Sequence, residues 1–434
     1  MKKVALHNLG CKVNAYETDA MQELLENGGY QIVPFKEGAD IYIINTCTVT
    51  NIADRKSRQM LHRAKKMNQN AIVVAAGCYV QAEKNKGRDA QIDPSIDIMI
   101  GNNRKQDLIR ILAEYEQTQV DGDIREEWID INKTREYETL SLSKTAEHTR
   151  AYIKVQDGCN QFCTFCIIPF ARGRVRSRAK ADVISEVEQL VQNGYQEVVL
   201  TGIHLSSYGV DIEGDLLSLI LAINEVPGIK RIRLSSLEPR IIDETFAKTI
   251  SQLNTICPHF HLSLQSGSNA TLRRMNRRYS AEEYREKCDL LRNYFDHPAL
   301  TTDVIVGFPG ETEEEFEESR AFIESIGFYE THIFKYSPRQ GTKAAEMAEQ
   351  VDERLKTSRS NILLQLGKHK QKEYEMSLVG KTVEILVEEK IDLDGESVWT
   401  GHTKEYVKVA VKSEENLKNM LIKNVIDNHL QIIH

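Results

Sequence analysis

The sequence predicts an α/β protein with three domains. Its 434 residues correspond to about three domains of ~150 residues, and a hydrophobic content of 41% allows each of them to bury a core. Apolar strand-like segments alternate with amphipathic helical segments up to about residue 375, and short alternating segments without helices follow them. We therefore expect an N-terminal open parallel α/β domain, a larger central parallel barrel or sheet, and a small C-terminal all-β barrel.

The composition excludes several other classes of protein. Charged residues make up 28% of the chain, with only 24 Gly and 9 Pro, so collagen-like, low-complexity and wholly disordered chains are excluded. Apolar stretches such as residues 71–77 are far shorter than the ~20 residues of a membrane-spanning helix, so no membrane association is expected. The N-terminus lacks the apolar region of a signal peptide, which predicts a cytoplasmic protein. The net charge of −8 gives no indication of a nucleic-acid partner.

The first domain, expected over residues 1–115, repeats a strand and a helix. Strands are expected at residues 4–8, 41–44, 71–76 and 96–100, and helices at residues 16–27, 53–66 and 105–115. A cysteine lies just past each of the first three strands: Cys11, Cys47 and Cys78. Their spacings of 36 and 31 residues match βαβ units of ~30 residues or more. Because the carboxyl ends of parallel strands share one edge of a sheet, the three thiols should converge in space.

Three converging thiols can be metal ligands or simply three small buried side chains, since cysteine is often buried. Helix N-termini beginning beside them would stabilise thiolates. Because no fourth ligand is evident, the set suits an iron–sulfur cluster with one open iron better than a closed tetrahedral zinc site. After this domain, residues 116–144 become polar and acidic, and we interpret them as a linker.

A second group of cysteines follows the next expected strand, at residues 151–156. Cys159, Cys163 and Cys166 form a Cys-x3-Cys-x2-Cys loop, with Phe165 directly before the last cysteine. Three thiolates at this spacing can bind one metal centre and leave a fourth position for another ligand. A zinc knuckle would add a nearby fourth ligand, and no Cys or His follows this loop before His204.

The Cys-x3-Cys-x2-Cys loop resembles that of the radical S-adenosylmethionine (SAM) superfamily, in which the open iron of a [4Fe-4S] cluster chelates SAM. The resemblance implies a partial (βα)6 barrel over residues 145–375, with Cys159, Cys163 and Cys166 as the catalytic cluster ligands. The remaining strands are expected at residues 197–200, 230–235, 259–264, 301–306 and 331–336, and helices at 182–193, 215–225, 243–252, 281–294 and 312–326. A further helix at 355–374 leaves the barrel.

Polar or glycine-rich residues follow the strands of the expected barrel, where a barrel holds its ligands. By resemblance they are the residues that bind SAM: Phe165, Gly202, Ser235, Glu238, Gln265 and Gly307. A glycine at a strand end is also ordinary turn chemistry, so each position alone is a weak signal. Cys257 and Cys288 have no partner at metal-ligand spacing and are interpreted as structural.

Residues 376–434 resemble the TRAM domain, a small OB-like barrel that binds RNA. Acidic residues outnumber lysines in this segment, so RNA contacts would come from a local patch that includes Lys381 and Trp399. A second candidate for RNA contact directly follows the cluster loop. Arginines stand there at every second position, and an extended chain would direct them to one side: Arg172, Arg174, Arg176 and Arg178. Solvated surface charge is the alternative for both sets.

The order of a three-cysteine α/β domain, a radical SAM barrel and a TRAM-like tail resembles the methylthiotransferase family over essentially the whole chain. Segments 9–14, 48–58, 166–173 and 235–239 most resemble the bacterial enzymes that convert N6-threonylcarbamoyladenosine 37 of tRNA to its 2-methylthio derivative. The family also contains enzymes for N6-isopentenyladenosine 37 and for an aspartate of a ribosomal protein, and both remain alternatives. A zinc-containing RNA-binding protein without catalytic activity is the alternative from another class.

The resemblance implies two [4Fe-4S] clusters and SAM as cofactors. The cluster at Cys159, Cys163 and Cys166 would cleave SAM to a 5′-deoxyadenosyl radical that activates C2 of adenine. The cluster at Cys11, Cys47 and Cys78 would provide sulfur, and a second SAM the methyl group. We further expect a flavodoxin or ferredoxin as electron donor and a monomeric protein.

Overall fold

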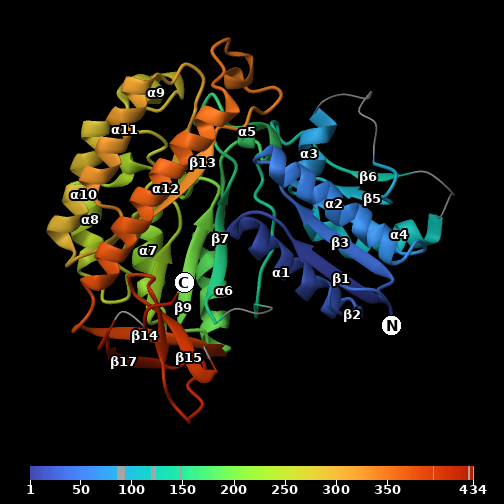
Figure 1. Ribbon diagram of the computed structural model, residues 1–434. Helices are drawn as coiled ribbons and strands as arrows, with labels where there is room; N and C mark the ends of the chain where they lie inside the picture. Colours follow the sequence, from blue (N-terminus) through green and yellow to red (C-terminus); the bar gives the residue numbers. More distant parts are fainter. Residues whose placement is uncertain (86–92, 119–123, 146–148, 394, 429–430, 434) are drawn as a thin grey trace.

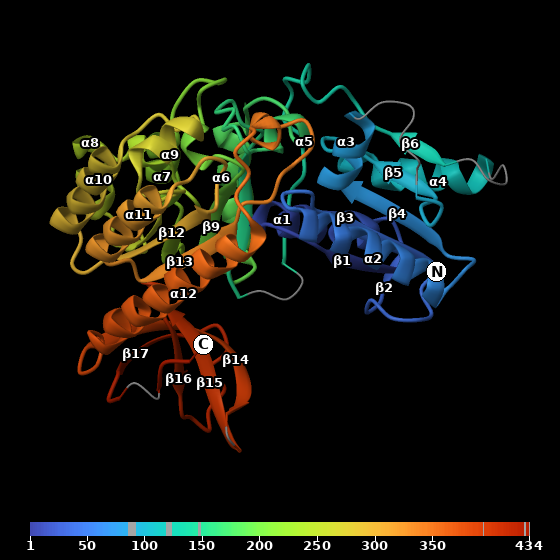
Figure 2. The ribbon, with the colours of Figure 1, turned by 45° about the horizontal axis from the view of Figure 1, so that its top comes forward.

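The fold consists of two α/β units side by side and a small β unit beneath the second of them (Figures 1 and 2). The computed structural model describes all residues except 86–92, 119–123, 146–148, 394, 429–430 and 434. The α/β class and the three-part order predicted from the sequence are confirmed. Within the described residues, we find no helix that combines the length and the apolar character needed to cross a membrane.

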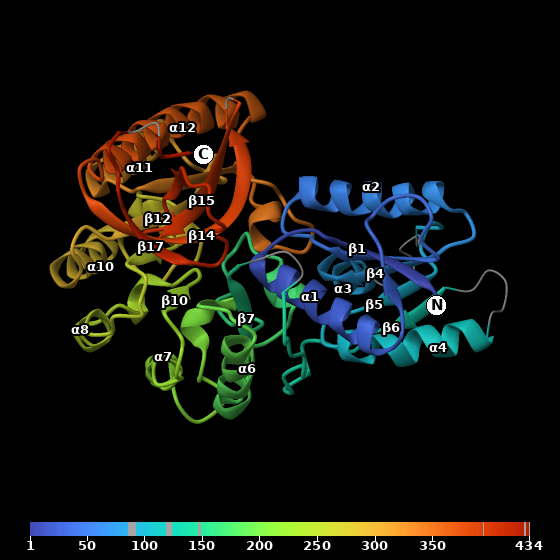
Figure 3. The same ribbon diagram turned by 90° about the horizontal axis from the view of Figure 1, so that it is seen from below.

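The N-terminal unit is a parallel sheet of six strands in the order β2-β1-β3-β4-β5-β6. The strands are β1 (Lys3–Asn8), β2 (Gln31–Ile32), β3 (Ile41–Thr46), β4 (Ile72–Gly77), β5 (Ile98–Ile100) and β6 (Arg125–Glu127). Helices α1 (Lys12–Asn27) and α4 (Leu108–Thr118) cover one face, and α2 (Asn51–Met67) and α3 (Cys78–Asn85) cover the other (Figure 3). Strand β6 lies within residues 116–144, so the segment expected to be only a linker also extends this sheet.

The central unit contains six parallel strands that form a partial barrel, as expected. They are β7 (Ala151–Asp157), β9 (Glu197–Gly202), β10 (Arg231–Leu234), β11 (His259–His261), β12 (Ala299–Val306) and β13 (Glu330–Lys335). Single parallel bridges, Ile232 with Ile256 and Leu237 with Leu262, join the first three strands to the last three. Short β8 (Arg176–Ser177) pairs antiparallel with β7, which the sequence did not predict.

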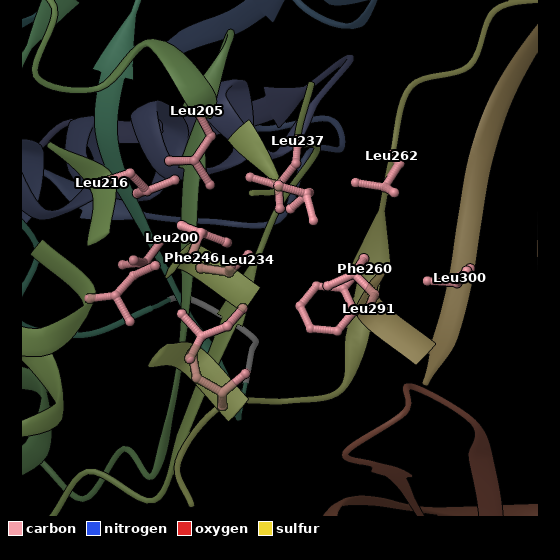
Figure 4. Close-up of a cluster of buried hydrophobic side chains, with 14 of the residues drawn as sticks. Leu200, Leu205, Leu216, Leu234, Leu237, Phe246, Phe260, Leu262, Leu291 and Leu300 are labelled. Carbon is pink, nitrogen blue, oxygen red and sulfur yellow. The ribbon is translucent and has the colours of Figure 1, made fainter. Parts of the chain in front are cut away.

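Helices outside the barrel strands bury the main hydrophobic core. They are α6 (Lys180–Gln192), α7 (Leu216–Asn224), α8 (Glu244–Ser251), α10 (Ala281–Tyr294) and α11 (Glu313–Ile326). Figure 4 shows core side chains such as Leu200, Leu234 and Phe260 from the strands and Leu291 from α10. Two shorter helices, α5 (Ile168–Ala171) and α9 (Asn269–Arg274), lie in loops at the carboxyl ends of strands.

The C-terminal unit begins after the long helix α12 (Glu353–Met376). Strands β14 (Thr382–Leu393), β15 (Glu396–Thr403), β16 (Lys408–Val411) and β17 (Leu421–Val425) form an antiparallel sheet in the order β16-β15-β14-β17. This unit packs under the barrel: Arg231 donates to the Glu384 and His402 carbonyls, and Arg233 donates to the Lys404 carbonyl. The small sheet therefore closes the end of the barrel opposite the cysteine loop.

Candidate active site

The structure brings Cys11, Cys47 and Cys78 to one edge of the first sheet. Cys11 precedes α1, Cys47 directly follows β3, and Cys78 is the first residue of α3. The Asn14 side chain amide donates to the carbonyls of Leu9 and Thr46, at 2.6 and 3.0 Å, and so joins the first two cysteine loops. Burial is the main cause of the raised pKa of Cys47, and the nearness of Cys78 and Cys11 raises it further, as expected for close thiols.

Gly10 shows how tightly this edge is built. Its φ of +107° is in the region that favours glycine, and a Cβ here would lie 3.0 Å from Cys47 Sγ. Any larger side chain would therefore displace the Cys47 thiol. The glycine before Cys11 thus allows the close approach of two sulfur atoms from different loops.

The second cysteine loop runs from the end of β7 to α5 and is fixed by backbone hydrogen bonds. The Cys159 N–H donates to Gly173 O at 3.0 Å, and the Thr164 N–H donates to Met275 O at 3.1 Å. Arg277 Nη1 donates to Cys163 Sγ at 3.3 Å, and the Cys166 N–H donates to Cys163 O at 3.0 Å. The loop is thus held by backbone hydrogen bonds to the segments around Gly173 and Met275, and the Cys163 sulfur accepts a hydrogen bond from the Arg277 guanidinium.

The chemistry of the thiols fits an iron–sulfur group at each triad. Burial raises the pKa of Cys47 to about 12 and that of Cys159 to about 11, and it also raises the pKa of Cys166. Such thiols become thiolates only when a bound cation compensates the charge, and all of them are free of disulfides. Residues Cys159, Cys163 and Cys166 could hold one cluster, and Cys11, Cys47 and Cys78 a second.

A buried network of charges joins the first triad to residues on either side of the second cysteine loop. Arg172, which follows the second cysteine loop, donates from Nε to Cys78 Sγ at 3.2 Å and from Nη1 to Glu17 Oε1 at 2.7 Å. The same guanidinium contacts Asp157 at 3.2 Å, and Lys154 Nζ lies 2.7 Å from both Glu17 and Asp157. The cations hold the pKa values of both carboxyls below their usual range although burial opposes this.

This network corrects the expectation that four arginines form one exposed row. Arg172, Arg176 and Arg178 are buried, and the carboxylates that pair with them are buried too. Of the four, only Arg174 is partly exposed, and its guanidinium lies 4.5 Å from the centre of the Phe162 ring. The chain turns at Arg172 and Gly173, whose φ is +71°, and is extended only at β8. The expected row of side chains therefore does not form, and the buried arginines meet protein rather than solvent.

Trp399 is also placed differently from the expectation. Its side chain is buried in the core of the C-terminal unit, with the Lys390 ammonium 5.7 Å from the ring centre. A base cannot stack on it there, because both faces are occupied by protein. Lys381 is exposed at the start of β14, as a phosphate contact would require.

Two polar atoms near the carboxyl ends of β9 and β10 lack a partner. Ser235 Oγ and His204 Nε2 are buried and form no hydrogen bond with any described residue. Burial lowers the pKa of His204 to about 4, so its imidazole is neutral at physiological pH. Buried polar atoms are nearly always satisfied, and these two atoms are therefore suited to contact a ligand in the barrel.

Glu238, Gln265 and Gly307, which were also expected to bind SAM, differ in their contacts with the protein. Glu238 accepts a hydrogen bond from Arg240 Nε at 2.6 Å, and Gln265 has a φ of +70° in the loop after β11. The Gly307 N–H donates to Glu311, and a Cβ at Gly307 would lie 2.3 Å from Lys356 Cγ. Close packing thus explains the glycine at position 307 without a ligand.

Phe165 and Gly202 both lie near the carboxyl ends of barrel strands: Phe165 in the cysteine loop after β7, and Gly202 as the last residue of β9. Phe165 packs edge-to-face on Phe308, with ring centres 6.4 Å apart. A Cβ at Gly202 would meet Gln156 Oε1 at 2.8 Å, so the glycine permits the Gln156 side chain to bridge two strand ends. The geometry is compatible with a cofactor at both positions.

The structure also brings together three residues that sequence reasoning missed. His261, Asp303 and His332 come from β11, β12 and β13, and their donor atoms lie within 4.8 Å of one another. His261 Nδ1 is bonded to Thr301 Oγ1 at 3.0 Å, which turns its Nε2 toward Asp303 at 3.3 Å. Successive side chains of a strand point to opposite faces of a sheet, and these three all face the barrel interior. This alternation could have indicated the group of His261, Asp303 and His332 from the sequence.

Family models match two of the three units. The model described as "Radical SAM superfamily" matches residues 153–323, and that described as "Uncharacterized protein family UPF0004" matches residues 3–101. Among solved structures, a radical S-adenosylmethionine methyltransferase, TsrM, from Kitasatospora setae has a TM-score of 0.58 at 16% identity, covering 80% of this chain and 78% of its own. At that identity the comparison concerns the fold alone.

Curated relatives match almost the entire chain. The threonylcarbamoyladenosine tRNA methylthiotransferase MtaB of Bacillus subtilis is 41% identical over 98% of this chain and 93% of its own. The protein of the same name from Aquifex aeolicus is 42% identical over 89% and 92%. A tRNA-2-methylthio-N(6)-dimethylallyladenosine synthase from Alkaliphilus oremlandii is 34% identical over 97% and 89%. The protein therefore belongs to the radical SAM methylthiotransferase family.

Proposed function

We propose that the protein converts N6-threonylcarbamoyladenosine 37 of tRNA to its 2-methylthio derivative. The observation that carries the proposal is the pair of cysteine triads on the two facing units, with Arg172, which follows the second cysteine loop, donating to Cys78 of the first triad across the interface. Membership of the family supports methylthio transfer with a [4Fe-4S] cluster and SAM. The two MtaB relatives described above, at 41% and 42% identity, favour the threonylcarbamoyl substrate over the dimethylallyl one, at 34%.

The residues of the chain would position the cluster and SAM for this reaction. Cys159, Cys163 and Cys166 would hold the cluster, which would supply the electron for the reductive cleavage of SAM. Arg277 holds the Cys163 sulfur from one side, and Ser235 and His204 offer unsatisfied polar atoms to the cofactor. The C-terminal sheet closes the end of the barrel opposite the cysteine loop.

Exposed cations near the barrel opening could hold the tRNA backbone. The first turn of helix α2 contacts the segment that follows the carboxyl end of β13. The Asn51 N–H donates to Ser337 Oγ at 3.2 Å, and Arg339 Nη2 lies 2.6 Å from Asp54. Along α2 the exposed basic residues are Arg55, Lys56, Arg58, Arg63 and Lys66. Together with Arg174 and Lys381 they replace the buried arginines as the proposed phosphate contacts.

A test of the substrate is expression of the chain in bacteria that lack their own tRNA methylthiotransferases. We expect 2-methylthio-N6-threonylcarbamoyladenosine in digested tRNA, measured by mass spectrometry, and no 2-methylthio-N6-isopentenyladenosine. Methylthio product confined to isopentenyladenosine, or to a ribosomal protein, would refute the proposed substrate.

The second cluster has its own test. Anaerobically purified protein should contain about eight irons per chain, and Cys47→Ser should contain about four, because one triad loses a ligand. The variant should still release 5′-deoxyadenosine from SAM but form no methylthio product. Cys257→Ser is the control, because this buried cysteine lies outside both triads and should leave the iron content unchanged. Equal iron contents in Cys47→Ser and the control would contradict a cluster at the first triad.

A further inference from the structure

A short segment of the barrel unit contacts both cysteine loops. This segment, residues 337–344, follows β13 and is called the bridging segment below. Near its start, Arg339 Nη2 donates to Thr48 Oγ1 at 2.8 Å, and Thr48 directly follows the second cysteine of the first triad. At its end, the Ala344 N–H donates at 2.9 Å to the carbonyl of Thr164, which lies within the second cysteine loop.

The contact of Arg339 with the first unit includes a buried ion pair. Arg339 and Asp54 are both buried, and Arg339 Nη2 lies 2.6 Å from Asp54 Oδ2. The other carboxylate oxygen of Asp54 accepts a hydrogen bond from Thr48 Oγ1 at 2.6 Å. Because each charge of a buried pair is costly without its partner, this contact favours a single placement of α2 against the barrel unit.

Helix α2 connects this ion pair to a cysteine of the first triad. Ser57 lies three residues after Asp54 on the buried face of the helix. Its Oγ accepts a hydrogen bond from the Cys47 N–H at 3.2 Å and donates to the Cys47 carbonyl at 3.0 Å. The backbone of Cys47 is therefore held by the same part of α2 that Arg339 contacts.

The bridging segment is short and held by its own contacts. The N–H and the hydroxyl of Thr342 both donate to the Arg339 carbonyl, at 3.0 and 2.7 Å. Ala344 is buried in a hydrophobic cluster against which Phe165 of the second cysteine loop packs. Even a fully extended chain would separate the Cα atoms of Arg339 and Ala344 by at most about 18 Å, and this turn makes the span shorter.

The relative position of the two triads matters for the reaction. In the proposed function, one carbon atom of the nucleoside has to be activated from the second triad and to receive sulfur from the first. Positioning effects of this kind are large, since a displacement of about 1 Å can lower a rate about 100-fold. A segment that fixes both cysteine loops therefore affects the combination of the two steps more than either step alone.

We propose that Arg339 is a positioning residue that sets the placement of the two triads and so couples SAM cleavage to sulfur transfer. This inference rests on the proposed function. Arg339 acts through Thr48 and α2 on the first triad, and through the turn to Ala344 on the second cysteine loop. Without it each triad keeps its three cysteines, so SAM cleavage continues while fewer of the cleavage events lead to a methylthio product.

The test measures how many methylthio nucleosides are formed for each 5′-deoxyadenosine released. Iron-loaded protein is incubated with SAM, a reductant and tRNA carrying N6-threonylcarbamoyladenosine 37. In Arg339→Met this ratio should fall about 10- to 100-fold, while the release of 5′-deoxyadenosine is retained. Arg339→Lys should restore part of the ratio, because lysine keeps the charge beside Asp54 but lacks the planar fork that also reaches Thr48.

A second measurement follows the contacts without turnover. Hydrogen exchange of the iron-loaded protein, followed by mass spectrometry, should be faster in Arg339→Met over residues 48–58 and 340–346. Lys343→Met removes an exposed lysine of the bridging segment and should change neither the exchange nor the ratio of products. Iron per chain should equal that of the unmodified protein. If Arg339→Met loses iron, Asp54→Asn takes its place, since it removes the ion pair with almost no change in volume.

The outcomes distinguish this inference from the function on which it rests. If the unmodified protein forms no methylthio nucleoside, the proposed function fails, and the exchange measurement still shows whether Arg339 holds the two segments. If the unmodified protein is active and the variant with full iron gives the same ratio of products, the role of Arg339 is refuted while the function stands. A parallel loss of both products at full iron also refutes it, because Arg339 would then serve SAM cleavage rather than its coupling to sulfur transfer.

Discussion

Replacement of Arg172 by methionine is expected to lower the free energy of unfolding by about 3–5 kcal/mol, the usual cost of removing one partner from a buried ion pair. The substitution leaves Glu17 and Asp157 buried with less compensating charge, although Lys154 still contacts both carboxylates. It also removes the donor to Cys78 Sγ, so less iron should be bound at the first triad. Denaturant unfolding followed by circular dichroism measures the first effect, and iron analysis measures the second.

Arg174→Met is the matched control for this prediction. Arg174 stands two residues away, is partly exposed and contacts the Phe162 ring. Its loss should change the free energy of unfolding by about 1 kcal/mol or less, the range of an exposed cation–π contact. If Arg172→Met and Arg174→Met are equally stable, the buried network does not hold the two domains together as described.

Cys163→Ala should have the largest effect on chemistry. We expect about four of the eight irons to be lost and the release of 5′-deoxyadenosine from SAM to fall below detection, because in the proposed function the cluster at this site would supply the electron for SAM cleavage. Chromatographic measurement of 5′-deoxyadenosine under strong reductant is the assay. Cys288→Ala, a change in a buried cysteine of α10, should retain both the iron and the release.

The comparison with Cys47→Ser separates the loss of a cluster from the loss of SAM cleavage. Each variant should lose about half of the iron, but only Cys163→Ala should lose 5′-deoxyadenosine formation. Release of 5′-deoxyadenosine by Cys163→Ala at the rate of Cys288→Ala would contradict the assignment of the second triad as the site of SAM cleavage.

The parts of the fold that the sequence predicted well are those set by local patterns. Strand Ile41–Thr46 begins with four apolar residues and ends directly before a cysteine, and helix α11 begins with a Thr312–Glu315 capping box that is visible in the sequence. Cysteine is rare in this chain. Its occurrence just after each of the first three strands therefore indicated that the three thiols meet at one edge of the sheet. These signals depend on neighbours in the chain, which a sequence gives directly.

The parts that were missed depend on pairs of residues far apart in the chain. Arg172 and its partner Glu17 are separated by 155 positions, and nothing near Arg172 indicates that a carboxylate will cover it. Trp399 on an alternating strand could face either solvent or core, and the packing of the whole sheet decides this.

Reaction of the reconstituted protein with SAM, a reductant and a purified tRNA carrying N6-threonylcarbamoyladenosine 37 tests the central claim most directly. The account predicts 2-methylthio-N6-threonylcarbamoyladenosine in the digested tRNA, together with 5′-deoxyadenosine and S-adenosylhomocysteine. Formation of 5′-deoxyadenosine without a methylthio nucleoside, or transfer only to tRNA carrying N6-isopentenyladenosine, would contradict it.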